Sequence, residues 1–273
     1  MDSSADDDFR KELEGTLPFG RGVRVLAADA VGLFALEKPA GTMTHPNAAG
    51  TAKKSLFAAD YSLRDECYSC RVPGGKIRKV FVLNRLDSPT SGVVLAATDE
   101  RVAAAVRRAF REDGVSKVYA AVVRGRVAPG QELWRDFLRR GRSRDGALRV
   151  EVARANSRDA LFAETLRSVV RTGTLALGGG APVAGTLLRL EPRTGRTHQL
   201  RVQCASRGIP IFGDKTYGDF RLNARAADAA VPAVRDRLFL HSETTEIAFP
   251  LRGKIVRFRA ESPLPQEFGA LLP

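Results

Sequence analysis

The sequence has few of the residues that form disulfides or metal sites. Its 273 residues include only three cysteines and three histidines. Cys67, Cys70 and Cys204 are too few for a disulfide framework. Cys67 and Cys70 have the spacing of half a zinc site, but no second pair of cysteines exists. We therefore predict two reduced thiols in a loop or strand, and no bound metal.

Long apolar runs are also missing. No stretch reaches the length of a membrane-spanning helix, although apolar residues make up 44% of the chain, enough for a substantial core. The first eight residues are acidic and lack the basic-then-apolar pattern of a secretory signal. Internal repeats and low-complexity tracts are not evident. These absences favour a cytoplasmic protein, with an organellar location as the alternative.

The abundant feature is positive charge. Lys and Arg number 44 against 31 Asp and Glu, which gives a formal net charge of +13. Arginine carries most of this charge, and its planar guanidinium suits phosphate better than a solvated lysine does. The balance favours a nucleic-acid partner, bound with a steep salt dependence, over a merely basic soluble protein.

Short strands dominate the predicted secondary structure, and the helices are few. The clearest helix runs from Thr98, as its cap, to Gly114, and a second covers 196–207 and is closed by Gly208. This pattern predicts an α+β fold around a mixed, largely antiparallel sheet. Apolar runs predict strands over 31–38, 80–83, 93–96, 117–123, 186–190, 238–241 and 255–258.

Three other segments lack such a clear pattern. Residues 1–21 are acidic and are predicted to form an arm, either flexible or loosely docked, before a single domain over 22–273. Residues 135–160 are very rich in arginine and are predicted to form irregular strands or loops facing solvent or RNA. The glycines at 178–180 favour a hairpin connection over a phosphate-binding loop, because no nucleotide-binding pattern surrounds them.

One carboxylate stands where an apolar strand ends. Asp87 follows Asn84-Arg85-Leu86 and precedes the turn-forming run Ser-Pro-Thr-Ser-Gly. An aspartate there is often only a turn former that bonds nearby backbone amides. An ionised carboxylate is also a competent nucleophile that forms and releases an ester-like adduct. The sequence leaves both roles open, with the cation Arg85 two residues away.

About a hundred residues later, the run from Thr194 to Arg201 gathers cations and amide donors. A guanidinium such as that of Arg201 would hold a nearby carboxylate charged and oriented when water leaves the site. The alternative is a surface arginine on a helix. His198 is not expected to bind a metal, because no carboxylate or second histidine stands three or four residues away.

Together, the two runs resemble the strongest motifs of the RluA-type RNA pseudouridine synthases, and the resemblance covers about residues 22–272. Asn84 departs from the family, which has His at this place in most members, and the small N-terminal RNA-binding module of many members is not evident. Further runs that resemble family landmarks, in the expected order, are 37–41 with 45–46, 208–218 and 240–241.

The resemblance implies a pseudouridine synthase catalytic domain, with helices and loops flanking the sheet around a central RNA-binding cleft. It implies that Asp87 is the catalytic nucleophile, that Arg201 pairs with it, and that Tyr119 stacks on the target uracil and helps remove the C5 proton. Arg85 would fill the space that the flipped base leaves, and Leu200 would pack on that base. The expected RNA-binding residues are Arg85, Lys117, Arg196, Thr197, His198, Gln199 and Leu200.

The predicted function is isomerisation of specific uridines to pseudouridine in structured RNA, either rRNA or tRNA. The resemblance implies a monomer that needs no cofactor and no metal. Two other functions stay open. One is an RNA-binding protein of the same fold without catalysis, and the other is a base-releasing hydrolase that uses Asp87.

Overall fold

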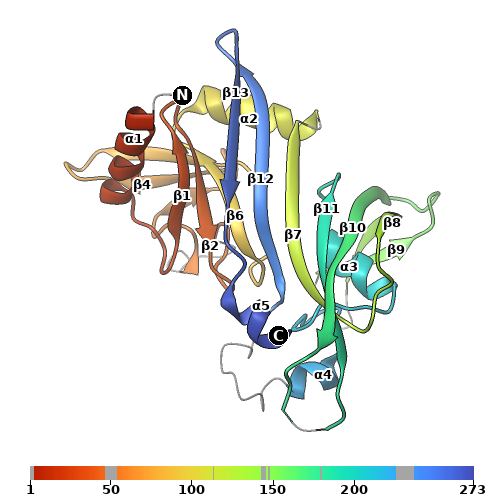
Figure 1. Ribbon diagram of the computed structural model, residues 1–273. Coiled ribbons are helices and arrows are strands. Elements are labelled where there is room, and N and C mark those ends of the chain that lie inside the picture. Colours follow the sequence, from red (N-terminus) through yellow and green to blue (C-terminus); the bar gives the residue numbers. More distant parts are fainter. Residues whose placement is uncertain are drawn as a thin grey trace. The chain divides into compact units, whose positions relative to one another are not determined.

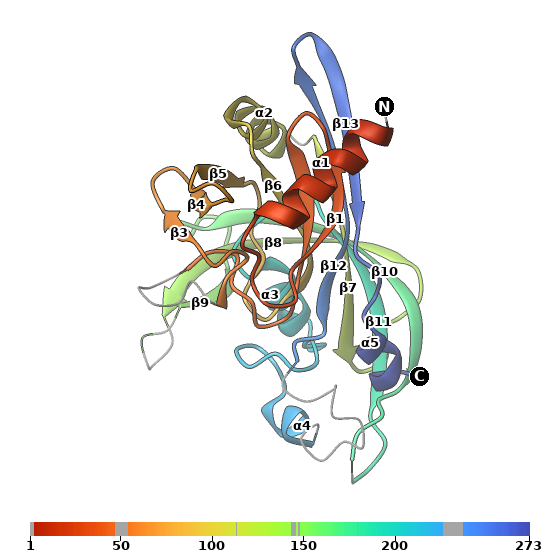
Figure 2. The same cartoon turned by 90° about the vertical axis from the view of Figure 1, so that its left-hand side faces the viewer.

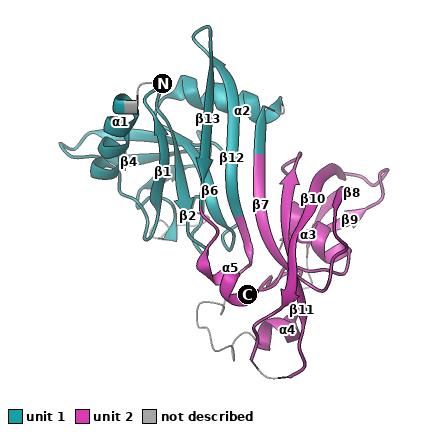
Figure 3. Ribbon diagram, in the orientation of Figure 1, with its two compact units in different colours: residues 1–116, 242–262 teal, residues 117–241, 263–273 magenta. Residues whose placement is uncertain are grey.

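The computed structural model describes residues 3–46, 54–112, 114–142, 146, 148–178, 180–225 and 237–273. Its contacts divide the chain into two compact units (Figure 3). Unit 1 contains residues 1–116 and 242–262, and unit 2 contains residues 117–241 and 263–273. The predicted division at residue 21, before a single domain over 22–273, stays a prediction. Among the described residues, no helix has the length and apolarity that a bilayer crossing requires.

The sheet of unit 1 is built mostly from antiparallel neighbours (Figure 1). Its strands follow the order β3-β4-β5-β6-β12, with β2 also paired to β6, β1 to β2, and β13 to β12. The bounds are β1 Arg24–Asp29, β2 Leu33–Lys38, β3 Asp60–Ser62, β4 Cys67–Arg71, β5 Ile77–Val82, β6 Ser91–Ala97, β12 Leu240–Leu251 and β13 Lys254–Glu261.

The core of unit 1 forms between this sheet and helix α2, Glu100–Arg111. Strand β6 is buried at every residue, so its uniformly apolar sequence reads as a strand covered on both faces. The helix buries Val102, Ala103, Val106 and Ala109 on one face. Its N-cap residue is Asp99 and not the predicted Thr98, because the Asp99 carboxylate accepts from the amides of Arg101 and Val102 in the first turn of the helix.

The N-terminal segment is a helix that packs on β1, so of the two predicted forms of the arm the structure has the docked one. Helix α1, Ser3–Thr16, lies across β1 in Figure 2. Leu13 is fully buried, and Phe9 meets the ring of Phe34 edge-on, with 6.5 Å between ring centroids. Arg10 Nη2 donates to the carbonyl of Val25 at 3.1 Å. An apolar residue on each successive turn is enough to dock a helix whose other faces are acidic.

Unit 2 is an antiparallel sheet with the strand order β7-β11-β10-β8-β9. Its core includes residues of β7, β11 and α3. The strands are β7 Val115–Arg124, of which 115–116 belong to unit 1, β8 Gln131–Arg142, β9 Leu148–Ala153, β10 Leu161–Thr174 and β11 Ala184–Pro192. The helices are α3 Gln199–Ser206, α4 Phe220–Arg225 and α5 Gln266–Leu271.

The arginine-rich stretch 135–160 is more regular than predicted, because most of it forms the antiparallel hairpin of β8 and β9. Its arginines are compatible with strands because neighbouring strands supply carboxylates. Arg135 pairs with Glu164 on β10, and Arg139 pairs with Glu151 on β9. The hairpin connection predicted at 178–180 is confirmed at Gly178 and Gly180, which lie between the antiparallel strands β10 and β11, whereas Gly179 is outside the described residues. The α+β class is also confirmed.

Candidate active site

The Asp87 turn connects β5 to β6 in unit 1, and its predicted tight geometry is confirmed. The amide of Thr90 donates to the carbonyl of Asp87 at 3.0 Å. Arg85 is exposed and Asp87 is half-buried. The Asn84 side chain accepts from the amide of Leu95 on β6 at 2.7 Å. The residue that departs from the family motif therefore anchors the start of the turn to the sheet.

A buried lysine, Lys38, ties this turn to the loop that follows β2. Its side chain is fully buried, and Nζ donates to three carbonyls, of Pro39 at 3.1 Å, Thr42 at 2.6 Å and Ser88 at 2.9 Å. Three acceptors match the three donors of an ammonium group. Burial lowers the pKa of Lys38 to about 7, and the negative charge of Asp87 opposes that shift.

The depressed pKa of Lys38 gives a stability prediction. The unfolded chain keeps its proton up to about pH 10.5, whereas the folded protein releases it near pH 7. Between these values the unfolded state binds more protons, so the free energy of unfolding rises with pH. Relative to Lys38→Met, the wild type should gain about 1 kcal/mol per pH unit between pH 7.5 and 9.5.

Urea unfolding of both proteins across this pH range measures the difference. Lys254→Met, at an exposed lysine of β13, is the matched control and should follow the wild-type curve. Parallel curves for wild type and Lys38→Met would contradict the prediction.

The second motif leads into α3 in unit 2. The predicted helix over 196–207 is shorter, because α3 begins at Gln199 and Arg196 to His198 precede it. His198 is the N-cap residue with a φ of 52°. Gly208 closes the helix as predicted, with a φ of 73° and its amide bonded to the carbonyl of Ala205.

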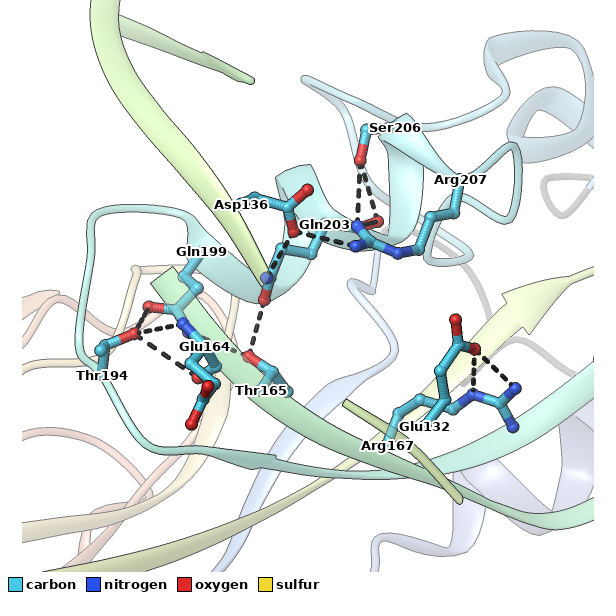
Figure 4. Close-up of polar contacts among 10 residues, drawn as sticks. All are labelled: Glu132, Asp136, Glu164, Thr165, Arg167, Thr194, Gln199, Gln203, Ser206 and Arg207. Carbon is cyan, nitrogen blue, oxygen red and sulfur yellow. Dashed lines mark hydrogen bonds and ion pairs between the residues drawn. The ribbon is translucent and has the colours of Figure 1, made fainter. Parts of the chain in front are cut away.

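A row of buried polar side chains fastens α3 to β10 and β8 (Figure 4). Thr165 on β10 donates to the Gln203 oxygen at 2.6 Å, and Gln203 Nε2 donates to Asp136 on β8 at 2.7 Å. Asp136 also pairs with Arg207 at 3.0 Å. These directional bonds fix the rotation of α3 about its axis, and so the direction in which its other side chains point.

Gln199, which is expected from the sequence to bind RNA, belongs to the same network. Its Oε1 accepts from the Thr194 hydroxyl at 2.8 Å and from the Arg196 amide at 3.0 Å. Its Nε2 donates to the carbonyl of Glu164 at 3.1 Å and to the Thr165 hydroxyl at 2.9 Å. These four bonds use the whole hydrogen-bonding capacity of an amide, so none is left for RNA.

Arg201 is buried, so the alternative of a surface arginine is wrong. It is only 5% exposed, and it makes a bidentate pair with Asp214 through Nε at 2.7 Å and Nη2 at 2.8 Å. Burial alone would raise the pKa of Asp214, but Arg201 and the amides of Tyr217 and Thr216 outweigh it and lower that pKa. Two of the three guanidinium nitrogens are thus fixed by a carboxylate that stays ionised.

Tyr217 connects the pair of Arg201 and Asp214 to His198 of the motif. Arg201 lies over its ring, at 5.2 Å from the centroid, and Arg149 of β9 lies at the same distance. The Tyr217 hydroxyl is bonded to His198 Nδ1 at 2.8 Å and accepts from the Val150 amide at 2.8 Å. Neither Asp214 nor Tyr217 was assigned a role from the sequence. Both lie in the landmark run 208–218, which gave no indication of their partners.

The remaining predicted residues lie near this group in unit 2. Tyr119 is half-buried on β7 and packs against the same core cluster that contains Leu200. Lys117 is half-buried on the same strand, and its ammonium points toward Gly195. Arg196 is exposed and donates to the carbonyl of Phe162 at 2.8 Å. The Thr197 hydroxyl accepts from Arg140 of β8 at 2.8 Å, so the β8–β9 hairpin is connected to the motif.

The structure therefore gathers Lys117, Tyr119 and the 194–201 motif within unit 2, and it holds Arg85 and Asp87 on the turn of unit 1. The predicted pairing of Asp87 with Arg201, and the RNA-binding cleft, stay predictions. Lys38, Asp214 and Tyr217, which contact these two motifs, were given no individual role in the sequence analysis.

The cysteines of the half zinc site lie in β4, as predicted for thiols in a strand. Cys67 and Cys70 are both buried and unbridged. Burial raises the pKa of the Cys70 thiol to about 12, so the thiolate form that binds metals is disfavoured at neutral pH. Within the described residues, no cluster of three His, Cys, Asp or Glu side chains has the arrangement of a metal site.

Known proteins are similar to this chain in sequence and in fold. The model of the family described as RNA pseudouridylate synthase matches residues 32–206. Ribosomal large subunit pseudouridine synthase D of Xanthomonas campestris is 31% identical over 246 residues, covering 88% of this chain and 66% of its own length. tRNA pseudouridine synthase C of Haemophilus ducreyi is 32% identical over 218 residues, covering 80% of this chain and 82% of its own length.

Solved structures agree on the fold. Human RNA pseudouridylate synthase domain containing 1 has a TM-score of 0.61 at 24% identity, covering 92% of this chain and 90% of its own. Human RNA pseudouridylate synthase domain containing 4 has a TM-score of 0.60 at 22% identity, covering 98% of this chain and 95% of its own. At such identities the likeness concerns the fold, whereas the family follows from the sequence matches. The chain belongs to the RNA pseudouridylate synthase family.

Proposed function

We propose that this protein isomerises uridine to pseudouridine in RNA, with Asp87 as the nucleophile and Arg201 as its cationic partner. The observation that carries the proposal is that the family match, residues 32–206, contains the Asp87 turn, Tyr119 and Arg201. The structure adds two supports. The turn that presents Asp87 is held by buried bonds, and Arg201 is fixed by Asp214 in the ionised form that attracts a carboxylate.

The proposed chemistry needs no net oxidation or reduction. Asp87 attacks the target nucleotide at the ribose C1′ or at the uracil ring, and the bond between C1′ and N1 breaks. The base then rotates and rejoins C1′ through C5. The C5 proton leaves with the help of Tyr119, N1 gains a proton, and the carboxylate is released. Substrate and product have the same composition, so we propose catalysis without a cofactor or metal.

Flipping the target nucleotide out of its stack costs a few kcal/mol. We propose that Arg85, exposed beside Asp87, fills the vacated space, and that Tyr119 and Leu200 form the surface on which the uracil packs. Lys117, Arg196, Thr197 and His198 would then seat the backbone. Gln199 is left out of this group because its amide is saturated within the protein.

The RNA substrate is proposed as structured rRNA or tRNA. One relative is named for the large ribosomal subunit and another for tRNA, at 31% and 32% identity, so similarity does not choose between them. The chain spans about two thirds of the length of the first relative, which carries residues outside the match. We propose a cytoplasmic monomer that selects RNA through residues of this chain or through a partner.

One experiment separates this proposal from its alternatives. RNA from cells that lack the protein is incubated with purified protein and tested for carbodiimide-reactive pseudouridine and for strand scission at abasic sites. We expect new pseudouridine without scission. Bound but unmodified RNA would indicate a non-catalytic RNA-binding protein, and scission would indicate a base-releasing hydrolase. Sequencing the modified positions then identifies the RNA and the uridine.

The proposed phosphate contacts, to which we add Arg140 because it donates to the Thr197 hydroxyl, predict a change in salt dependence. Lys117→Ala and Arg140→Ala should each weaken RNA binding and reduce the slope of log affinity against log salt by about 0.7 to 0.9. Filter binding at several salt concentrations measures this slope. Arg259→Ala is the control, because Arg259 on β13 is already held by Glu246 and Glu261. Slopes equal to that of the wild type would remove both residues from the RNA interface.

A further inference from the structure

The main chain immediately before Asp87 is held by one hydroxyl group. The Thr44 side chain donates to the carbonyl of Leu86 at 2.9 Å, and the amide of Leu86 donates back to the same oxygen at 3.2 Å. Thr44 is 4% exposed and Leu86 is 7% exposed, so water does not readily replace these bonds. A single buried atom therefore satisfies both polar groups of the residue next to the candidate nucleophile.

The position of Leu86 explains why this contact matters. Residues 83–87 lie between the end of β5 and the start of β6, so Leu86 has no strand neighbour to bond its main chain. Buried main-chain groups must find partners elsewhere. On the other side of Asp87, the carbonyl of Ser88 accepts from Lys38 and from the amide of Gly41. Bonds to both neighbours thus restrict the direction in which the Asp87 carboxylate points.

Hydrogen bonds also hold the main chain of Thr44 and of the residue before it. The Thr44 carbonyl accepts from the hydroxyl of Tyr68 at 2.8 Å, and Tyr68 is fully buried on β4. The residue before it, Met43, exchanges main-chain bonds with Lys54 at 2.8 Å and Leu56 at 3.1 Å. Burial raises the pKa of Tyr68, so its hydroxyl keeps the proton that it donates. Strand β4 and the segment 54–56 therefore support the Asp87 turn through Met43 and Thr44.

We propose that Thr44 is a positioning residue for the Asp87 carboxylate and acts through the main chain of Leu86. The inference rests on the proposed function, because it assumes that Asp87 reacts with the target nucleotide. Positioning has large effects on such reactions, since a displacement of about 1 Å at the reacting group costs about a hundredfold in rate. RNA binding does not depend on it, because Thr44 is buried.

The test compares Thr44→Val with Thr44→Ser. Valine keeps the shape and removes the hydroxyl, whereas serine keeps the hydroxyl. We expect Thr44→Val to lower kcat by about ten- to a hundredfold with KM within about threefold, and Thr44→Ser to stay within about threefold of wild type. Hydrogen exchange at the Leu86 amide should become at least tenfold faster in Thr44→Val only, which reports the lost bond without any reaction.

The matched control is Thr245→Val on β12. Thr245 is fully buried in the same unit, and its hydroxyl has no hydrogen-bond partner within the described residues. The same replacement there removes no bond and should leave kcat unchanged. A Thr44→Val protein with faster Leu86 exchange but the kcat of Thr245→Val would overturn the inference.

Tyr68→Phe supplies a second variant in case Thr44→Val does not fold. It removes the bond to the carbonyl of Thr44, together with the bonds of the same hydroxyl to Ser55 and Leu56, so kcat should fall by about three- to tenfold and KM should not change. In the double variant with Thr44→Val, Tyr68→Phe should lower kcat by less than a further threefold, because both replacements act on the same main chain. An unchanged kcat in Tyr68→Phe would count against the inference. Failure of the proposed function would look different, since the wild type itself would then show no turnover.

Discussion

Replacement of Asp87 by asparagine is expected to abolish pseudouridine formation and to leave RNA affinity within about threefold of wild type. The amide has the shape of the carboxylate but is not a nucleophile, so no adduct forms. Loss of a nucleophile costs more than about a thousandfold in rate in enzymes that depend on one. Two bonds hold the main chain of the turn. The Thr90 amide donates to the Asp87 carbonyl and Lys38 Nζ donates to the Ser88 carbonyl, and neither bond involves the Asp87 side chain.

Single-turnover conversion of unmodified RNA measures the rate, and filter binding measures the affinity. Asp60→Asn, at an exposed aspartate of β3, is the matched control for the loss of one negative charge in unit 1. Turnover by Asp87→Asn at more than a tenth of the wild-type rate would remove Asp87 from the mechanism. Turnover lost together with RNA binding would point to a misfolded turn instead.

The second large effect is expected at Arg201. Arg201→Met should lower the rate by several orders of magnitude, because the candidate nucleophile loses the cation proposed to hold it. It should also destabilise the protein by about 3–5 kcal/mol, since the buried carboxylate of Asp214 is left unpaired. The two losses have different causes, and they are separated by changing Asp214 as well.

In the double variant Arg201→Met with Asp214→Asn, no unpaired charge is buried. Its stability should recover by more than about 2 kcal/mol relative to Arg201→Met, whereas turnover should stay lost. Urea unfolding and single-turnover rates measure the two quantities. Recovery of turnover together with stability would show that Arg201 is only structural.

Arg167→Met is the matched control for Arg201→Met. Arg167 is a second buried arginine of unit 2, paired with Glu132 at 2.8 Å, and it is not part of the motif. Its replacement should cost stability but should leave the rate of the folded protein within about threefold. Equal losses of rate in the two variants would mean that any buried arginine of unit 2 has the same effect.

Local sequence determined the features that depend on neighbouring residues. The uniformly apolar run of β6 predicted a buried strand, Gly208 predicted the end of α3, and the run after Asp87 predicted a tight turn. The two motifs also indicated the family, because their residues and order are specific. The errors in secondary structure have physical reasons. Helix α1 depends on docking through Leu13, and the β8–β9 hairpin depends on carboxylates of other strands.

The sequence alone determined the fold class, and it indicated the two side chains proposed for the reaction, the carboxylate of Asp87 and the guanidinium of Arg201. Only the tertiary structure showed that Arg201 is fixed by Asp214, that Gln199 is saturated, and that Thr44 and Lys38 support the Asp87 turn. The reason is that a hydrogen bond depends on distance and direction. Partners separated by tens of residues, such as Thr44 and Leu86, become neighbours only when the chain has folded.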